Sequence, residues 1–326
     1  MNEIRNLISQ TQNNDESRQY LAATCYFTSI VKRLAKWQLI LTVLIPVASS
    51  ISAIRFPWVR TWAALYGIVI SIVDVSLIER KLREWKIDSA KIQECFDCKI
   101  LNIAWNEIKV GSKPEREKIS SASERYRQKC DNELEDWFTT EIAALPLPLA
   151  RIIGQRINTW WPTAIRRKYL WWLQFIFITL CISALVVSIA IGMGMDALIL
   201  AVLAPLSPTI LWFIREIRKQ KETTAKLEGL MDKIEAIWDK ARGVELTKEQ
   251  LEELEEKARQ FQDETYDFRC SYQPINSSVY RFLRKDFQKR MQTTVTEMVR
   301  EALHTLESRS DVTLIEKIHQ DHESAK

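Results

Sequence analysis

Few residues in this sequence have the types and spacing that chemistry requires. Cys95 and Cys98 form a C-x-x-C pair, a spacing found in zinc sites and in redox-active dithiols. No second cysteine pair or histidine pair follows, so a zinc site would lack ligands. Both thiols also fall on one face of an expected helix. Structural thiols, kept reduced in a cytoplasmic location, and a redox pair are the two interpretations left.

Other catalytic signatures are missing. The sequence has no P-loop, no G-x-G-x-x-G, no G-x-S-x-G and no H-E-x-x-H. Its three histidines, His304, His319 and His322, lie near the C-terminus and give little support for a metal site. We therefore expect no enzyme activity, no catalytic residue, no cofactor and no metal.

Asp74 is the one residue of chemical interest inside an apolar stretch. A carboxylate near the end of a membrane span costs energy and often marks a pore, a relay or a partner contact. Asp74 also lies only about one helical turn before Glu79, at the expected boundary, where it would be partly hydrated. It is therefore a candidate pore or gating residue, with a hydrated boundary carboxylate as the alternative.

Two long apolar blocks position the rest of the chain. A single helical crossing needs about twenty apolar residues, so the block from Tyr169 to Ile214 allows two crossings joined by a turn at Gly192–Asp196. The first block has crossings at Trp37–Ile54 and Thr61–Ile78, joined by a short turn. We predict an all-α integral membrane protein with two transmembrane helical hairpins, four crossings in all. The cytoplasmic helical domain would combine the central and C-terminal segments.

This interpretation divides the chain into five parts. They are a cytoplasmic N-terminal helix (1–36), the first transmembrane hairpin (37–78), a central cytoplasmic helical segment (79–168), the second transmembrane hairpin (169–214) and a C-terminal cytoplasmic helical segment (215–326). Prolines interrupt the crossings at Pro46, Pro205 and Pro208. Proline is tolerated in a membrane helix when neighbouring helices or Ser hydroxyls satisfy the carbonyls that it frees.

The overall composition hides this division. The chain of 326 residues is 47% hydrophobic and 27% charged, and its mean hydropathy of −0.17 resembles that of a soluble protein. The net charge of +4 comes largely from basic residues at the expected membrane boundaries, and no nucleic-acid signature is present. The expected partner is the lipid bilayer, and we expect no nucleic acid.

Charge asymmetry predicts the orientation. The turn at 55–60 carries two arginines and the turn at 192–196 carries no basic residue, whereas the opposite ends of the crossings carry many. The positive-inside rule therefore places both termini and the central segment in the cytoplasm of a bacterial inner membrane. The basic residues on that side are Lys32, Arg33, Lys36, Arg80, Lys81, Arg83, Arg166, Arg167, Lys168, Arg215, Arg218 and Lys219.

Local patterns predict the helices of the cytoplasmic part. Residues 1–14 are polar and expected to fray, and helical spacing follows over 15–36, 79–98 and 215–240. Ser121 with Glu124 and Thr247 with Gln250 have the spacing of capping boxes that start helices. The first of these helices would carry Tyr126, Leu134 and Trp137, and an irregular segment is expected over 266–276.

Several polar clusters between the hairpins carry a resemblance to a known family. They are Ala90-Lys-Ile-Gln-Glu-Cys-Phe-Asp97, Trp105-Asn106, Trp137-Phe138, Leu145-Pro146, Gln155-Arg156-Ile-Asn158, Arg166-Arg167, Gln262-Asp263, Arg269 and Tyr280-Arg281. The arrangement resembles the SMODS-associating four-transmembrane effector family, a family of pore-forming effectors, from about residue 15 to about residue 300. Where that family has Asp after a Trp, this chain has Trp161-Pro162.

The resemblance implies a role in antiphage defence of the CBASS type. A CD-NTase-type synthase would sense infection and make a cyclic oligonucleotide, and the membrane effector would open or assemble into a pore. Four crossings from one chain are few helices to surround an aqueous pore, so a homo-oligomer is expected. The alternative is a non-pore membrane receptor or scaffold that recruits a cytoplasmic partner, and a membrane-bound enzyme ranks third.

A nucleotide signal would meet the cytoplasmic part. The candidate ligand-binding residues are Trp105, Asn106, Gln155, Arg156 and Asn158. They offer donors for phosphate or base edges and an aromatic ring for stacking. The alternative is that these residues cap helices and join the two cytoplasmic segments.

Overall fold

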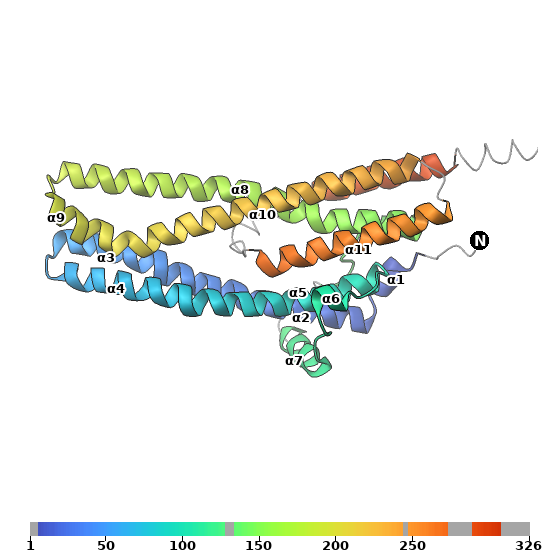
Figure 1. The fold of residues 1–326 in the computed structure, drawn as a ribbon, viewed down its shortest axis with the longest axis horizontal. Coiled ribbons are helices and arrows are strands. Elements are labelled where there is room, and N and C mark those ends of the chain that lie inside the picture. The colour runs from blue at the N-terminus through green and yellow to red at the C-terminus, as the bar shows by residue number, and fades with distance from the viewer. Residues whose placement is uncertain (1–5, 128–133, 244–246, 273–288, 308–326) are drawn as a thin grey trace, which may run out of the picture.

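Four long helical rods run the length of the molecule (Figure 1). The computed structural model describes residues 6–127, 134–243, 247–272 and 289–307, and these ranges contain helices and no strand. The rods span Asp15–Arg55, Val59–Ile100, Leu147–Ala190 and Met195–Arg242, and each has 41 to 48 residues with one strongly apolar window. Because a crossing uses about twenty residues, each rod continues from a membrane span into a helical bundle outside the membrane. The all-α class and the four crossings are confirmed.

The elements follow one another with few breaks. Those of the first two rods are α1 (Ile8–Gln12), α2 (Asp15–Leu39), η1 (Ile40–Leu44), α3 (Ile45–Arg55), α4 (Val59–Val73), η2 (Asp74–Ile78) and α5 (Glu79–Ile100). Those that follow are α6 (Glu107–Val110), α7 (Arg116–Arg127), η3 (Thr140–Ala144), α8 (Leu147–Ala190), α9 (Met195–Leu198), η4 (Ile199–Leu203), α10 (Ala204–Gly243) and α11 (Lys248–Ser271). Residues 289–307 are also helical. Three short segments, η1, η2 and η4, are π-helical and lie in or at the end of a span.

Hydroxyl groups satisfy the carbonyls that the membrane prolines free. Pro46 removes the donor for the carbonyl of Thr42, and Thr209 donates to that carbonyl at 2.9 Å. Pro205 likewise frees the carbonyl of Ala201, which accepts from Ser50 at 2.8 Å. The two bonds run in opposite directions between α3–η1 and η4–α10, so they also tie these spans together. The sequence-based explanation of how Pro46 is tolerated is therefore confirmed, with a Thr hydroxyl in place of a Ser.

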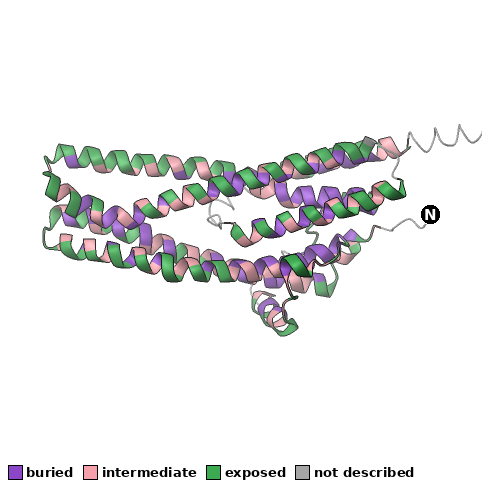
Figure 2. Ribbon diagram, viewed as in Figure 1, coloured by how far each residue is buried: buried purple, intermediate pink, exposed green. Residues whose placement is uncertain are grey.

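The spans do not pack equally well. Small residues, among them Ala53, Ala63 and Ala201, bring α3, α4 and η4 together. Gly67 of α4 lies so close to α10 that a Cβ there would be 2.8 Å from the carbonyl oxygen of Ala204. The membrane half of α8 differs, since only 11% of its apolar window is buried. Figure 2 shows this half of α8 as mostly exposed along its length.

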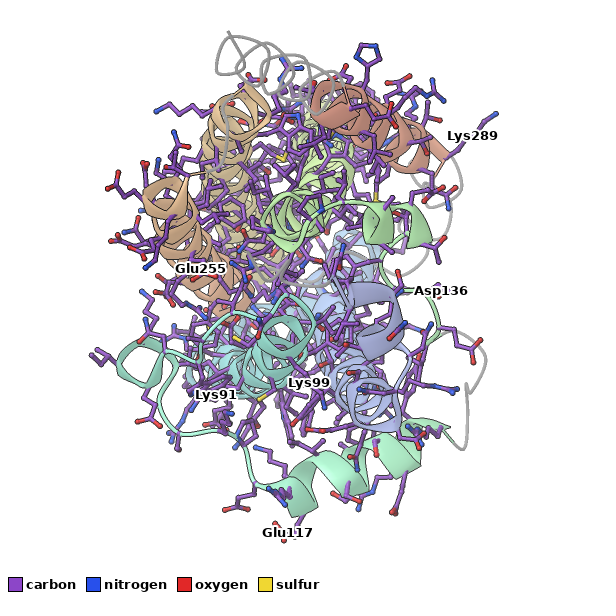
Figure 3. The ribbon with its side chains drawn as sticks, turned by 90° about the vertical axis from the view of Figure 1, so that its right-hand side faces the viewer. Lys91, Lys99, Glu117, Asp136, Glu255 and Lys289 are labelled. Carbon is purple, nitrogen blue, oxygen red and sulfur yellow. The ribbon has the colours of Figure 1, made fainter. Side chains whose placement is uncertain are left out.

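The helical bundle beyond the spans holds the main hydrophobic core. Phe96 of α5, Ile153 of α8, Leu227 of α10 and Phe261 of α11 belong to one buried cluster. The central and C-terminal segments therefore share a core, as the sequence predicted for a combined domain. The end-on view in Figure 3 shows this bundle with charged side chains, such as Glu117 and Glu255, extending from its rim.

Three local expectations are wrong. Residues 6–14 do not fray: Ile8 is 1% exposed in the core, and Asn6 donates to the carbonyls of Ile142 and Leu145. Ser121 does not cap a helix, because α7 begins at Arg116 and the Ser121 hydroxyl donates to a carbonyl three residues earlier.

The third error concerns the end of α11. This helix continues to Ser271, so the first part of the segment expected to be irregular is helical, and residues 273–276 lie outside the described residues. Its buried side chains Tyr266 and Phe268 hold it in place. Leu134 and Trp137 lie in non-helical chain. The capping box of Thr247 with Gln250 is confirmed with both of its bonds.

Candidate functional site

A buried carboxylate cluster joins two helices, α5 and α11. Glu94 and Asp97 of α5 are fully buried. A carboxylate buried without a partner would lose its hydration at a cost of roughly several kcal/mol. Arg259 of α11 donates to Glu94 at 2.8 Å, and Arg269 of α11 lies 2.5 Å from Asp97. Gln262, between them on the same helix, donates to Glu94 at 2.8 Å and to Asp97 at 3.1 Å. We call these five residues the carboxylate clamp.

Helical spacing explains why these residues meet. Glu94 and Asp97 are three residues apart and therefore share one face of α5. Arg259, Gln262 and Arg269 recur along the facing side of α11. Arg259 also donates to the carbonyl of Ala104 at 2.6 Å, which fixes the chain just after α5 ends. The clamp thus holds α5, α11 and the following loop in one arrangement.

Four of the five ligand-binding candidates lie around this clamp. Asn158 of α8 donates to Asp97 at 3.4 Å, and Gln155 donates to the carbonyl of Ala258 at 2.8 Å. Asn106 caps α6 and donates to Asp263 at 2.8 Å. Trp105 is half-buried and donates from its indole to the carbonyl of a loop glycine at 3.0 Å. Each of these side chains therefore has a protein partner.

Arg156 points elsewhere. It pairs with Glu235 of α10 at 2.6 Å. It lines a polar cavity of about 300 Å³ that also contains Asp239, Arg242 and Glu301. Arg242 is itself paired with Glu301 at 3.0 Å. Acidic groups outnumber basic ones here, so this cavity is a poor match for an anion. Sequence adjacency of Gln155 and Arg156 does not place them in one site, because consecutive helix residues point about 100° apart.

Asp74 belongs to a second cluster, at the membrane boundary. Its side chain is fully buried, accepts from Gln38 of α2 at 2.7 Å and forms an ion pair with Arg215 of α10. Arg215 also lies 3.1 Å from Glu79, which accepts from Lys219 at 3.0 Å. We call these five residues the boundary cluster. Asp74 is therefore not a hydrated surface carboxylate, because its ion pair with Arg215 and its hydrogen bond from the Gln38 amide enclose it.

Buried polar groups connect the two clusters. Arg166 of α8 is 2% exposed, donates to Gln220 of α10 at 2.6 Å and lies against the rings of Phe268 and Tyr272. Burial lowers the pKa of Arg166 to about 10, so it remains charged at neutral pH. Lys86 of α5 lies at the same level, and its pKa falls to about 8 because of burial and the nearby charge of Lys219.

The two thiols of the C-x-x-C pair are buried beside the clamp. Cys98 donates to Glu94 and is approached by Arg259 at 3.3 Å. Burial raises the pKa of Cys95 to about 12 and raises that of Cys98 as well. Because the thiolate is the reactive form, this arrangement favours structural thiols over a redox pair. Among the described residues no group of three or more Cys, His, Asp and Glu could hold a metal ion.

The SMODS-associating 4TM effector domain matches residues 6–298, which is most of the chain. The protein belongs to this family. A probable CBASS effector molecule of Bacillus cereus strain VD146 is 25% identical over 240 residues, which cover 71% of this chain and 79% of the relative. No solved structure matches the chain.

Membership in this family confirms the resemblance found in the sequence and agrees with a multi-pass membrane protein. The family description names an effector domain with four transmembrane crossings. Sequence analysis missed Arg259 and Arg215 as partners. Their only signals were an i,i+4 spacing to Asp263 and a position at the end of the fourth crossing.

Proposed function

We propose that this family member is an antiphage effector that a cyclic oligonucleotide opens from the cytoplasm, to permeabilise the inner membrane as an oligomeric pore. One observation carries the proposal. Asp97 of the carboxylate clamp and Asp74 of the boundary cluster lie on one continuous helical rod, 23 residues apart. At 1.5 Å per residue the rod transmits a displacement over about 35 Å, from the bundle to the membrane.

The clamp is suited to respond to an anion. Arg259 and Arg269 face two buried carboxylates, and charge-assisted bonds of this kind also bind phosphate. Phosphate groups of a cyclic oligonucleotide would compete with Glu94 and Asp97 for these arginines. Trp105 packs with Tyr266 of α11 and directly follows Ala104, whose carbonyl accepts from Arg259, so its ring is placed to stack on a base. Binding would separate α11 from α5 and so release the rod.

The boundary cluster is the proposed gate. Asp74, Gln38 and Arg215 belong to three different spans, so their contacts hold α2, η2 and α10 together. Asp74 begins a π-helical segment, an irregular form that is frequent at functional sites. A shift of the rod would break these buried contacts and expose charges to the path between the spans.

The membrane half of α8 is the proposed contact between subunits. Its side chains from Phe175 to Ile191 have few neighbours within the chain. A path lined by four spans alone is narrow, and α8 spans from several copies would enlarge it. Cys181 is exposed on this half. In a chain without other cysteines, oxidation should give a Cys181-linked dimer in the membrane.

Both termini are proposed to lie in the cytoplasm. Single cysteines at Ser112 and Met193, in a cysteine-free chain, would be labelled in intact cells with an impermeant thiol reagent. Only position 193, in the turn after α8, should react. Labelling at position 112 would show the opposite topology. The clamp would then lie outside the cell, where a cytoplasmic nucleotide cannot reach it.

The decisive experiment measures membrane potential and dye entry in cells that express the full chain with a cognate synthase. We expect rapid depolarisation with the activator and none without it. Nucleotide binding by calorimetry should weaken in Arg259→Gln and stay unchanged in Arg156→Ala, because Arg156 pairs with Glu235 away from the clamp. Arg125→Gln on α7 serves as a matched control. Arrest of growth with a sealed, polarised membrane would contradict the pore and favour the scaffold alternative.

A further inference from the structure

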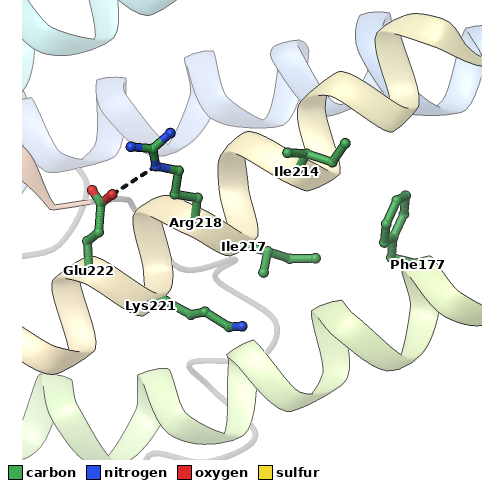
Figure 4. Close-up of a pocket in the computed structure, with 6 residues that line it drawn as sticks. All are labelled: Phe177, Ile214, Ile217, Arg218, Lys221 and Glu222. Carbon is green, nitrogen blue, oxygen red and sulfur yellow. Dashed lines mark hydrogen bonds and ion pairs between the residues drawn. The ribbon is translucent and has the colours of Figure 1, made fainter.

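A cavity of about 430 Å³ lies between α8 and α10 at the cytoplasmic end of the spans (Figure 4). Phe177 of α8 and Ile214 and Ile217 of α10 form its apolar walls. Arg218, Lys221 and Glu222 line its other end. The lining itself is almost wholly apolar, so Arg218, Lys221 and Glu222 contribute their aliphatic stems and their charged groups lie at the rim of this end.

The polarity of the cavity follows the direction of the bilayer normal. Exposed Trp171 and Trp172 of α8 mark the level of the headgroups, where aromatic side chains concentrate. Phe177 lies further along α8 into the span, at hydrocarbon depth. On the antiparallel α10, Lys221 lies beyond Ile214, the last residue of the predicted crossing, and so at headgroup level. The apolar end therefore faces acyl chains and the basic end faces the cytoplasmic leaflet surface.

The basic end carries one uncompensated positive charge. Arg218 donates to Glu222 at 3.0 Å, so these two charges balance. Lys221 forms no ion pair within the described part of the chain, and its side chain extends into the space between α10 and α8 (Figure 4). A ligand with a negative headgroup and an apolar tail matches this arrangement.

We infer that this cavity binds one anionic phospholipid of the cytoplasmic leaflet. An acyl chain would lie against Phe177, Ile214 and Ile217, and the phosphate would lie near Lys221. Basic pockets between membrane helices on the cytoplasmic side bind such headgroups. A zwitterionic lipid would bring its own ammonium group toward Lys221, and a soluble anion would gain nothing from the apolar walls. The inference does not depend on the proposed pore.

The test is native mass spectrometry of the purified full-length protein in mild detergent, titrated with dioctanoyl phosphatidylglycerol, dioctanoyl phosphatidylcholine or glycerol phosphate. Lys221→Gln removes the unpaired charge, and Ile217→Trp fills the apolar end. The matched control is Lys226→Gln, which changes an exposed lysine further along the same helix.

We expect a first phosphatidylglycerol adduct that forms at lower concentration than the phosphatidylcholine adduct, and no adduct of glycerol phosphate. Lys221→Gln should weaken phosphatidylglycerol binding by about fivefold, which corresponds to about 1 kcal/mol. Lys226→Gln should leave it unchanged, and Ile217→Trp should abolish the first adduct. Equal binding of the two lipids, or an adduct that persists in Ile217→Trp, would overturn the inference. Binding of glycerol phosphate to the wild type would assign the site to a soluble anion instead.

Discussion

The two halves of α8 belong to one helix but have opposite surroundings. From Leu147 to Arg156 every side chain is buried, whereas most of those from Phe175 to Ile191 are exposed (Figure 2). In water, burial of apolar surface contributes about 25 cal/mol for each Å², so the half of α8 outside the membrane is covered by other helices. In lipid that driving force between helices is absent. The bundle outside the membrane therefore sets the stability of the protein, while few specific contacts hold the spans together.

The largest effect should come from breaking the clamp. Asp97→Ala leaves Arg269 without its buried carboxylate, and an unpaired buried charge costs about 3–5 kcal/mol. The free energy of unfolding should fall by that amount, measured by chemical denaturation in detergent. The control is Glu228→Gln, which breaks the exposed pair with Arg167 and should cost less than about 1 kcal/mol. Equal losses in the two variants would show that the bundle does not depend on the clamp.

The next effect depends on pH. Burial lowers the pKa of Lys86 to about 8 from an ordinary value of 10.5. Between these values the unfolded chain binds more protons, so stability rises with pH across this window, and the full cost of the buried charge is present below pH 8. Lys86→Met should therefore raise the free energy of unfolding at pH 7, by up to about 3 kcal/mol.

The difference in the free energy of unfolding between Lys86→Met and the wild type should become smaller as the pH approaches 10. Thermal unfolding of both proteins at pH 7 and pH 10 measures this change. A gap that is the same at both values would mean that the charge of Lys86 carries no cost in the folded bundle.

A smaller effect is expected where two spans touch. Gly67→Ala places a Cβ 2.8 Å from the backbone oxygen of Ala204, and that oxygen cannot move as a side chain would. We expect a loss of about 1–3 kcal/mol from overpacking, read as a lower unfolding temperature in detergent. Gly194→Ala, at a position with no atom within 4 Å of the added Cβ, is the matched control and should be neutral. An unchanged Gly67→Ala protein would mean that α4 and α10 can separate freely.

The smallest effect tests the exposed half of α8. Ile182 is 57% exposed. In the detergent-solubilised monomer, Ile182→Leu should therefore keep the free energy of unfolding within about 0.5 kcal/mol of the wild-type value. Ile153→Leu, in the buried half of the same helix, is the sharper counterpart and should cost up to about 1.5 kcal/mol. A large loss of stability in Ile182→Leu would mean that the exposed half of α8 packs against partners after all.

Sequence patterns predicted the regular features well. Runs of apolar residues located the four crossings, and the spacing of Thr247 and Gln250 located the start of α11. The failures occurred where local signals competed with tertiary contacts. Ser121 has a capping pattern, yet α7 begins five residues earlier, and polar residues 6–14 become ordered because Ile8 enters a core built by distant helices.

The candidate site likewise shows that local patterns predict individual residues better than they predict tertiary contacts. Sequence alone marked Asp74 as unusual, because a carboxylate in an apolar stretch has an energetic cost in any fold. Its partners Gln38 and Arg215 are 36 and 141 residues away along the chain, and only the packing of α2 and α10 brings them to it. Sequence adjacency grouped Gln155 with Arg156, but the turn of one helix sends the first to α11 and the second to Glu235.

The sequence by itself determined that this chain is a helical membrane protein with four crossings and the pattern of a known effector family. Those properties depend on residue order within about twenty residues, which is the length that spans a bilayer. The tertiary structure decided which charges are buried together in the clamp and the boundary cluster. Burial of an ion pair depends on the facing of helices far apart in sequence, and no local pattern encodes which faces meet.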